Sequence, residues 1–192
     1  MKETHEFDKD YWERHWRQRS GGVADPNPHV VRETAELVAG TALDAGCGAG
    51  TEARWLARRG WQVTAADISA AALARANGAE DVRWVEADLA TWDPGRTFDL
   101  VLTCYAHPAM PQLRFYDRLA GWVAPGGTLL IVGHRSGDQH PEEATATASA
   151  VAARLDSATW TIVTAEEPSR TVHGGPAGKL HDVVVRATRA AV

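Results

Sequence analysis

The residues most able to do chemistry lie in one glycine-rich segment, Leu43-Asp44-Ala45-Gly46-Cys47-Gly48-Ala49-Gly50-Thr51. A short apolar run containing Asp44 leads into three glycines spaced G-x-G-x-G, and a helical pattern begins directly after them. Glycine is needed where a ligand approaches the backbone too closely for a Cβ atom. This spacing differs from the G-x-G-x-x-G of a dinucleotide pyrophosphate site. A carboxylate at Asp44 would repel a pyrophosphate and attract a ligand that carries an ammonium group.

Two further acidic residues follow at the ends of the next two predicted strands. Asp67 comes about 20 residues after the glycines, which is the spacing of an acidic residue that accepts hydrogen bonds from ribose hydroxyls. Asp88 follows the third strand, where it could accept from an adenine amine, and Leu89 offers an apolar face to the ring. S-adenosylmethionine carries an ammonium group, a ribose and an adenine but no phosphate. The three acidic positions therefore favour this ligand over a nicotinamide dinucleotide.

The elements that must position these residues alternate along the chain. Short apolar runs rich in Val, Ile and Leu are separated by helix-length segments, which is typical of βαβ units. The predicted strands are Ala42–Ala45, Trp61–Ala66, Val82–Val85, Phe98–Cys104, Thr128–Val132, Trp160–Thr164 and Asp182–Ala187. A glycine-rich turn at Gly174–Gly178 would pair the last two as a hairpin. We therefore expect an α/β fold, a three-layer Rossmann-like sandwich with a seven-stranded, mostly parallel sheet and an antiparallel C-terminal edge strand.

Helical patterns fill the intervals between the strands and precede the first one. The predicted helices are Asp8–Arg17, Val30–Val38, Thr51–Arg59, Ala70–Ala76, a helix opened by Pro111, and Glu142–Leu155. Residues 1–39 are expected to form an N-terminal helical lid segment and residues 40–192 the catalytic domain, a single domain overall. The aromatic stripe Tyr11, Trp12 and Trp16 either closes over the site or packs as an ordinary amphipathic helix.

The ordered motifs resemble those of class I S-adenosylmethionine-dependent methyltransferases. The matching pieces are Leu43–Gly50, Val63–Ser69, Glu86–Asp88, Phe98–Val101 and Val123-Ala124-Pro125-Gly126-Gly127-Thr128-Leu129. The compact length, the aromatic N-terminal helix and Gly133-His134 are similar to small methyltransferases of the tellurite-resistance and thiopurine types. The resemblance implies S-adenosylmethionine as cofactor and S-adenosylhomocysteine as product.

The resemblance also implies roles for individual residues. Asp44 and the glycines would hold the methionine part, Asp67 the ribose, and Asp88 and Leu89 the adenine. The complete set of expected cofactor-binding residues is Asp44, Gly46, Cys47, Gly48, Gly50, Asp67, Ile68, Asp88, Leu89 and Cys104. Both cysteines have an alternative interpretation as small apolar packing residues.

The end of the fourth strand, Thr103-Cys104-Tyr105-Ala106-His107-Pro108, is where this fold places groups near the transferring methyl. We expect His107 and Tyr105 to be catalytic, with His107 taking a proton from the acceptor. A structural histidine that bonds nearby backbone is an equal alternative. The expected substrate-binding residues are Trp12, Trp16, His29, His107 and His134.

Composition narrows the classes of partner. The net charge is −5 and the isoelectric point is about 5.9, so the chain has no general attraction to nucleic acid or anionic lipid. The polar, acidic N-terminus is unlike a signal peptide, no run of about 18 apolar residues is present, and the two cysteines lack metal-ligand spacing. We expect a cytoplasmic enzyme without metal that methylates a small molecule. The acceptor and the oligomeric state are not predicted.

Three other functions remain as alternatives. A nicotinamide-dependent oxidoreductase shares this kind of sheet, although the glycine spacing and Asp44 argue against it. A non-catalytic S-adenosylmethionine-binding module or assembly subunit would retain the same cofactor motifs. A nucleic-acid or protein methyltransferase would differ only in the variable parts of the fold, and the chain lacks an Asn/Asp-Pro-Pro-Tyr motif after the fourth strand.

Overall fold

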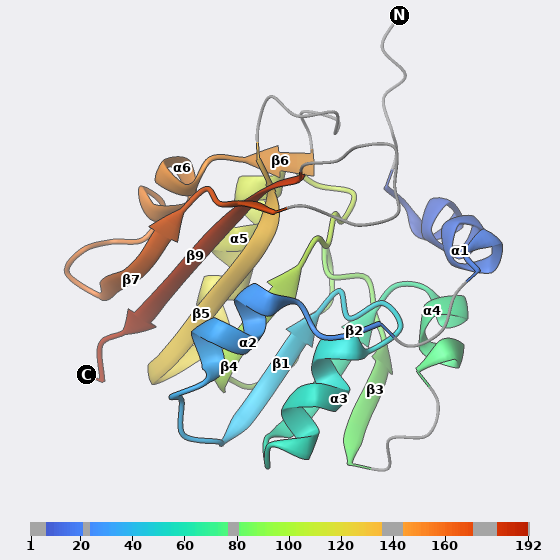
Figure 1. Cartoon of the computed structure of the whole chain (residues 1–192), viewed down its shortest axis with the longest axis horizontal. Coiled ribbons are helices and arrows are strands. Elements are labelled where there is room, and N and C mark those ends of the chain that lie inside the picture. Colours follow the sequence, from blue (N-terminus) through green and yellow to red (C-terminus); the bar gives the residue numbers. More distant parts are fainter. Residues whose placement is uncertain (1–6, 21–23, 77–80, 136–143, 171–179, 192) are drawn as a thin grey trace, which may run out of the picture.

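The computed structural model describes residues 7–20, 24–76, 81–135, 144–170 and 180–191. Its strands are β1 (Thr41–Ala45), β2 (Gln62–Asp67), β3 (Val82–Glu86), β4 (Phe98–Cys104), β5 (Val123–Arg135), β6 (Thr145–Ala146), β7 (Trp160–Glu166), β8 (Ser169–Arg170) and β9 (Leu180–Arg189). The main sheet runs in the order β3-β2-β1-β4-β5-β9-β7 (Figure 1). The short strands β6 and β8 pair with β5 and β9, respectively.

The expected seven-stranded, mostly parallel sheet is confirmed, with one difference at its C-terminal side. Strands β1 to β5 pair in parallel, β9 is antiparallel to β5, and β7 is antiparallel to β9. Among the described strands, β7 therefore forms the edge, and the antiparallel C-terminal strand lies one position inside it. Val183, Val184 and Val185 are all buried, which is the pattern of an interior strand covered on both faces.

Helices cover both faces of the sheet, as the three-layer prediction requires. They are α1 (Lys9–Gln18), α2 (Pro28–Thr34), α3 (Thr51–Arg58), α4 (Ala70–Arg75), α5 (Gln112–Gly121) and α6 (Ala148–Ala152). Val30 of α2 and Leu56 of α3 belong to the core on one face. Phe115 and Leu119 of α5 and Val151 of α6 belong to the core on the other face.

The strands serve both cores because successive side chains point to opposite faces. Leu43 and Ala45 of β1 belong to the core under α5 and α6, whereas Ala42 belongs to the core under α2 and α3. Burying a side chain such as Leu43 contributes about 1.5–3 kcal/mol relative to leaving it exposed. Because both faces of the central strands are buried, their sequences are continuous apolar runs and do not alternate between apolar and polar residues.

One predicted helix is shorter in the structure than the sequence pattern suggested. Of the expected helix 142–155, Thr145 and Ala146 instead form β6 and pair with the end of β5. The helix begins only after Thr147, whose side chain accepts a hydrogen bond from the backbone N–H three residues later. The ladder with β5 outcompetes the helical spacing of small residues. The predicted turn at 174–178 lies outside the described residues.

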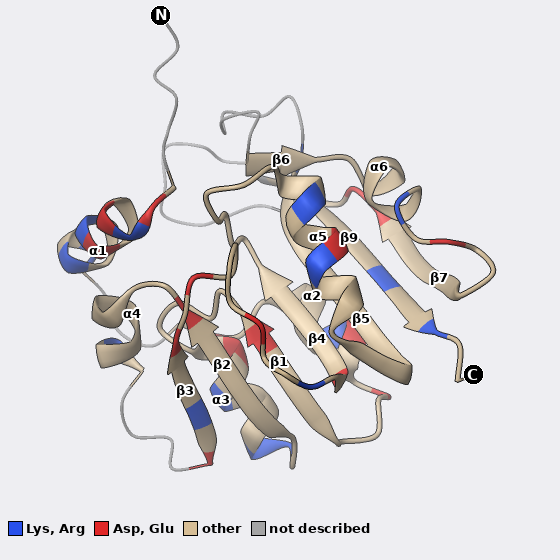
Figure 2. Cartoon of the chain, turned by 180° about the vertical axis from the view of Figure 1, so that it is seen from behind, with Lys and Arg blue, Asp and Glu red and all other residues tan. Residues whose placement is uncertain are grey.

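Helix α1 lies beyond the carboxyl ends of the parallel strands (Figure 1). Acidic residues, drawn in red in Figure 2, lie at these ends of β1, β2 and β3. Lys9 of α1 forms an ion pair with Glu86 at the end of β3, and the Trp12 indole N–H donates to the backbone carbonyl of His107, 3.1 Å away. None of the described helices has the length and apolar character needed to cross a membrane.

Candidate functional site

The turn between β1 and α3 is shaped by close contacts that only glycine permits. Gly46 and Gly48 have φ values of +78° and +52°, a region that L side chains rarely adopt. A Cβ atom on Gly46 would come within 2.2 Å of the Ala106 Cβ, and one on Gly48 within 2.6 Å of the Trp16 ring. The glycine loop is thus packed between the end of β4 and helix α1. Protein contacts, and not only the approach of a ligand, fix these glycines.

Asp44 lies behind the loop with one side-chain oxygen unsatisfied. The residue is 1% exposed, it accepts a hydrogen bond from the backbone of Ala53, and its Oδ2 has no hydrogen-bond partner among the described residues. Burial, reinforced by the nearby carboxylates of Glu52 and Asp67, raises the pKa of Asp44 well above its ordinary value. The site therefore contains an acidic centre that a cationic group would stabilise.

Asp67 closes the loop from the end of β2. Its Oδ2 accepts from the backbone N–H of Gly48 at 2.8 Å, and its Oδ1 accepts from that of Ser69 at 2.9 Å. Burial raises the pKa of Asp67, and these backbone hydrogen bonds oppose the rise. Because each carboxylate oxygen can accept a second hydrogen bond, the side chain is fixed in place and still able to accept from hydroxyl groups.

The end of β3 contributes an acidic and an apolar residue side by side. Asp88 Oδ1 accepts from the backbone N–H of Ala90 at 2.9 Å, an Asx turn that holds the carboxylate at the cavity wall. Leu89 is 5% exposed and lines the same wall, as does Ile68 from the end of β2. This part of the wall can accept hydrogen bonds and also cover a flat apolar ring.

The end of β4 brings aromatic residues to the other part of the cavity. Tyr105 has φ +55°, a conformation that costs a residue with a Cβ about 1–2 kcal/mol. Its ring stacks on His134 with a centroid separation of 4.6 Å, and His134 stacks on His107 at 5.4 Å. Phe7 and Trp12 lie within 5.6 Å and 6.4 Å of the His107 ring. The aromatic end thus combines strands β4 and β5 with the N-terminal segment.

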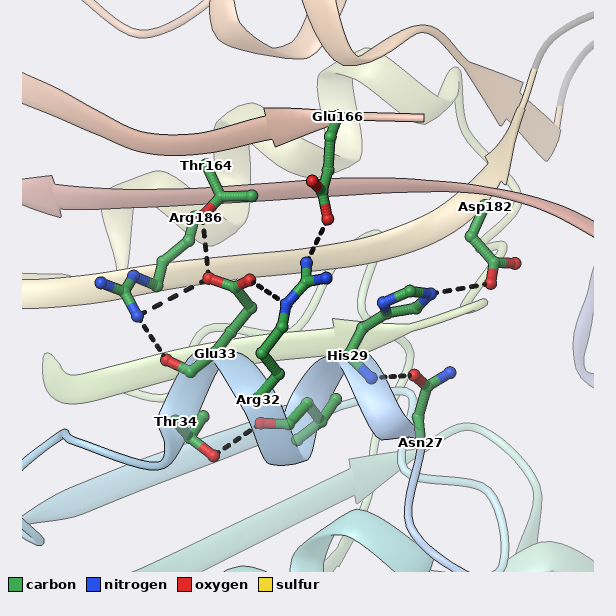
Figure 3. Close-up of polar contacts among 10 residues, drawn as sticks. Asn27, His29, Arg32, Glu33, Thr34, Thr164, Glu166, Asp182 and Arg186 are labelled. Atoms are coloured by element: carbon green, nitrogen blue, oxygen red, sulfur yellow. Dashed lines mark hydrogen bonds and ion pairs between the residues drawn. The ribbon is translucent and has the colours of Figure 1, made fainter. Parts of the chain in front are cut away.

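A hydrogen-bond network behind this wall holds Tyr105 in its strained conformation. The Tyr105 hydroxyl donates to Asp182 Oδ1 at 2.8 Å and accepts from Asn27 Nδ2 at 3.2 Å. The other oxygen of Asp182 lies 3.2 Å from His29 Nε2, and Asn27 caps α2 by accepting from the backbone N–H of His29 (Figure 3). Helix α2 and strand β9 therefore act together to place the phenol.

These residues surround one cavity of about 1210 Å³ that lies under α1. Of the residues expected from the sequence, the structure brings together on its wall Trp12, Trp16, Gly46, Cys47, Gly48, Asp67, Ile68, Asp88, Leu89, Cys104, Tyr105, His107 and His134. The described wall does not include Asp44, Gly50 or His29. Asp44 lies beneath the loop and His29 is buried at 8% exposure, turned toward Asp182 instead of the cavity.

Sequence reasoning missed four residues that shape the site. Asn27 and Glu52 line the cavity, and the Asn27 backbone N–H donates to Glu52 Oε1 at 3.0 Å. Gln112 and Asp182 are buried and contact His107 and Tyr105. The stiff Pro26-Asn27-Pro28 segment was a sequence signal for Asn27. An acidic residue at the start of an apolar strand was a signal for Asp182, because such a residue is seldom buried without a partner.

Burial also determines the protonation state of the Cys47 thiol, which lies in the cavity wall. Cys47 is buried, and burial together with the carboxylates of Asp44 and Asp67 raises its pKa well above the ordinary thiol value. The thiol is therefore neutral and packs as a small apolar group. Among the described residues, no group of three or more His, Cys, Asp or Glu side chains has a geometry that could hold a metal ion.

The arrangement of sheet, glycine loop and cavity is that of the class I methyltransferase fold. The chain superimposes on the N-methyltransferase NodS from Bradyrhizobium japonicum, crystallised with S-adenosylhomocysteine, with a TM-score of 0.73 and 20% identity, covering 96% of this chain and 98% of that one. It also superimposes on TehB from Haemophilus influenzae, with a TM-score of 0.71 and 17% identity, covering 95% and 66% of the two chains. Similarity to the tellurite-resistance type is thus shown at the level of the fold.

Sequence comparison agrees with the fold. Residues 42–127 match a family described as "Methyltransferase domain". An uncharacterized methyltransferase of Mycobacterium tuberculosis is 43% identical over 95 residues, which is 47% of this chain and 48% of the relative. A probable thiol methyltransferase of Arabidopsis thaliana is 29% identical over 137 residues, 63% of this chain and 60% of the relative. The chain therefore carries a methyltransferase domain over residues 42–127 and has the fold of the class I S-adenosylmethionine-dependent methyltransferases. Its match spans about half the length of the mycobacterial relatives.

Proposed function

We propose that this chain binds S-adenosylmethionine in the cavity under α1 and transfers its methyl group to a small-molecule nucleophile. The observation that carries the proposal is the grouping of Asp67, Asp88 and the glycine loop on one wall of a cavity whose other end is aromatic. S-adenosylmethionine is the cofactor of the class I methyltransferases, whose fold the chain shares. Structural relatives solved with S-adenosylhomocysteine include NodS, and this supports the proposal.

The charge and polarity of the residues present match the chemical groups of this cofactor. The unsatisfied Oδ2 of Asp44 suits the positive ammonium group, Asp67 suits the ribose hydroxyls, and Asp88 with Leu89 suits the adenine. In this proposal Gly46, Gly48 and Cys47 hold the methionine part through backbone and apolar contacts, and Gly50 shapes the turn behind them. When bound, the cofactor supplies a methyl group on a positive sulfonium. Tyr105 and Trp12 present aromatic faces suited to such a cation.

The acceptor is expected at the aromatic end. His107, His134 and Trp12 line that end, with Phe7 and Tyr11 from the N-terminal segment beside them. Such a wall favours a small, flat or soft nucleophile over a long polymer. Positioning by this wall and exclusion of water would supply much of the rate acceleration. In this proposal the part of segment 1–39 that serves as a lid is helix α1, with Trp16 packed on the glycine loop, whereas α2 belongs to the core. The proposed place of work is the cytoplasm, without nucleic acid or membrane partners.

Labelled methyl transfer to a panel of acceptors tests the proposal. The chain is incubated with S-adenosylmethionine carrying a ¹³C-methyl group and with thiols, phenols, amines, selenite or tellurite in turn. Mass spectrometry then follows the labelled product and S-adenosylhomocysteine. We expect turnover with at least one small acceptor and its loss in Asp67→Asn, whereas Asp93→Asn, an exposed aspartate, retains it.

The competing function is a binding module that keeps the cofactor site without turnover. The buried, ordered contacts of His107 and Tyr105 favour a working acceptor site over this alternative. Tight binding of S-adenosylmethionine with no labelled product from any acceptor would support the binding module and contradict methyl transfer to small molecules.

A further inference from the structure

Gln112 is a buried side chain in contact with the histidine at the acceptor end of the cavity. It is the first residue of α5 and is 4% exposed. Its Oε1 lies 3.2 Å from His107 Nδ1, and its Nε2 donates to the backbone carbonyl of Ala106 at 2.9 Å. A polar side chain this buried must satisfy its hydrogen-bonding groups within the protein.

The Ala106 carbonyl determines which way the Gln112 amide points. A backbone carbonyl oxygen only accepts hydrogen bonds, so the Gln112 atom 2.9 Å away must be the amide nitrogen. The reversed amide would bring two oxygens to this distance without a proton between them. Gln112 Oε1 must therefore be the atom that faces His107.

The orientation of the amide in turn determines the tautomer of His107. Oε1 can only accept, so the hydrogen bond with His107 requires a proton on Nδ1. In the neutral imidazole the other nitrogen, Nε2, then carries a lone pair. The sequence suggested His107 as a proton acceptor but gave no means of choosing the nitrogen.

We propose that Gln112 is a positioning residue that holds His107 in the Nδ1–H tautomer and so makes Nε2 the proton acceptor for a methyl acceptor that enters as a neutral O–H, N–H or S–H group. This inference rests on the proposed function. It adds a substrate class, because nucleophiles that carry no proton would gain nothing from this arrangement.

The proton and the electrons balance in this step. A lone pair of the acceptor atom forms the new bond to the methyl carbon, and the carbon–sulfur bond breaks with its electron pair moving to sulfur. The proton of the acceptor atom passes to His107 Nε2. The positive charge leaves the sulfonium and ends on the imidazolium, which returns the proton to solvent.

Further contacts keep the His107 ring from turning over. The Trp12 indole N–H donates to the His107 carbonyl at 3.1 Å, and the His107 ring stacks on the rings of Trp12 and His134 at interplanar angles of 26° and 28°. A ring held by stacking contacts and at Nδ1 presents the same nitrogen in each turnover. Such pre-orientation is what a general base requires.

Nitrogen NMR of the histidines tests the tautomer without any need for turnover. Protein labelled with ¹⁵N-histidine is measured at about pH 8.5, where an ordinary imidazole with a pKa of about 6.5 is neutral. The signal of His107 is identified from its absence in His107→Asn. We expect a protonated Nδ1 in the wild type, and a shift toward protonated Nε2 in Gln112→Leu. The control Gln62→Leu, at an exposed glutamine, leaves the signal unchanged.

The outcomes separate this inference from the proposed function. A protonated Nε2 in the wild type, or no change in Gln112→Leu, would overturn the role of Gln112 even in a protein that binds S-adenosylmethionine. If Gln112→Leu fails to fold, the wild-type spectrum alone decides the tautomer. Absence of S-adenosylmethionine binding would overturn the proposed function and with it the acceptor role of Nε2.

Kinetics give a second test with any acceptor that is turned over. Gln112→Leu should lower kcat by roughly tenfold or more, because a misplaced general base forfeits part of its ~100-fold or larger contribution. The KM for S-adenosylmethionine should stay within about twofold, since Gln112 is absent from the described cavity wall. A rise in that KM with kcat unchanged would contradict a role in orienting the base.

Discussion

At the scale of single residues, the close packing of the glycine loop predicts the effect of adding a side chain at Gly48. Gly48→Ala should weaken S-adenosylmethionine binding about tenfold or more and lower the melting temperature. The alanine would be held at φ +52°, and its Cβ would lie 2.6 Å from the Trp16 ring. Calorimetry and thermal unfolding measure the two effects. Gly95→Ala is the matched control, since Gly95 also has positive φ (+67°) but no atom within 4 Å of an added Cβ.

The control separates strain from contact. Gly95→Ala should carry only the conformational cost, about 1–2 kcal/mol, and leave binding unchanged. If both variants lose stability equally and binding is unaffected in both, the packing of α1 on the loop does not matter for the ligand.

A second prediction at this scale concerns Asp44. Its pKa is raised in the folded protein, so its contribution to stability is complete below the ordinary aspartate value of about 3.9 and is lost as pH rises through the folded value. Asp44→Asn should therefore make the ligand-free protein more stable at pH 7, with the advantage vanishing near pH 4. Urea unfolding at both pH values measures this difference.

The same variant should bind S-adenosylmethionine about tenfold more weakly, because the ammonium group loses the attraction of a carboxylate beneath the glycine loop. Stability and affinity thus move in opposite directions at neutral pH. An Asp44→Asn protein that is less stable at pH 7 and binds normally would show that Asp44 is only a structural acceptor for the backbone.

At the scale of elements, helix α2 is fixed by a buried acidic side chain. Glu33 is 5% exposed, contacts Arg32 and Arg186, and accepts from the Thr164 hydroxyl at 2.9 Å (Figure 3). This cluster joins α2 to β7 and β9. It holds the helix whose other end presents His29 to Asp182.

We expect Glu33→Gln to destabilise the protein by roughly 1–3 kcal/mol, since charged hydrogen bonds are lost inside a buried cluster. Chemical unfolding measures the change in the free energy of unfolding. Glu36→Gln, an exposed glutamate beyond the end of the same helix, should change it by less than about 0.5 kcal/mol. Equal effects of the two substitutions would contradict the anchoring role of the cluster.

Much of the element pattern could be predicted from the sequence, and the exceptions have physical causes. The central strands were predicted because both of their faces are buried, which leaves long apolar runs. The predicted pairing of the last two strands is confirmed by the antiparallel pair of β7 and β9. The position of β9 inside the sheet depends on its pairing with β5, a contact between distant segments that no local pattern encodes. Thr145 and Ala146 likewise pair with β5 against their helical spacing.

The same distinction applies to the site. Asp67 and Asp88 were predictable because each follows a strand at its carboxyl end, where ligands bind in open α/β sheets. Asp182 and Asn27 were not, because each contacts Tyr105 from more than 70 residues away in the sequence. Gln112 was not, because its contact with His107 depends on how the loop between β4 and α5 folds back on the helix. His29 was expected at the substrate and instead contacts Asp182, since the turn of α2 that carries it faces β9.

At the scale of the whole molecule, two cores hold the carboxyl edge of the sheet rigid while α1 covers it. Helix α1 contacts this end of the sheet through polar groups, such as Lys9 with Glu86, and through aromatic rings, such as Trp16 on the glycine loop and Trp12 on His107. The acidic end of the cavity is built by the sheet, and the aromatic end is built by the sheet together with the N-terminal segment. The central claim is that this one cavity takes S-adenosylmethionine.

Calorimetric titration with S-adenosylmethionine, S-adenosylhomocysteine and NAD, repeated on Asp67→Asn, tests that claim most directly. We predict binding of both adenosyl ligands with dissociation constants on the order of micromolar, about −8 kcal/mol, no binding of NAD, and a loss of affinity of about tenfold or more in the variant. Folded protein that binds neither adenosyl ligand, or that binds NAD more tightly, would contradict the account.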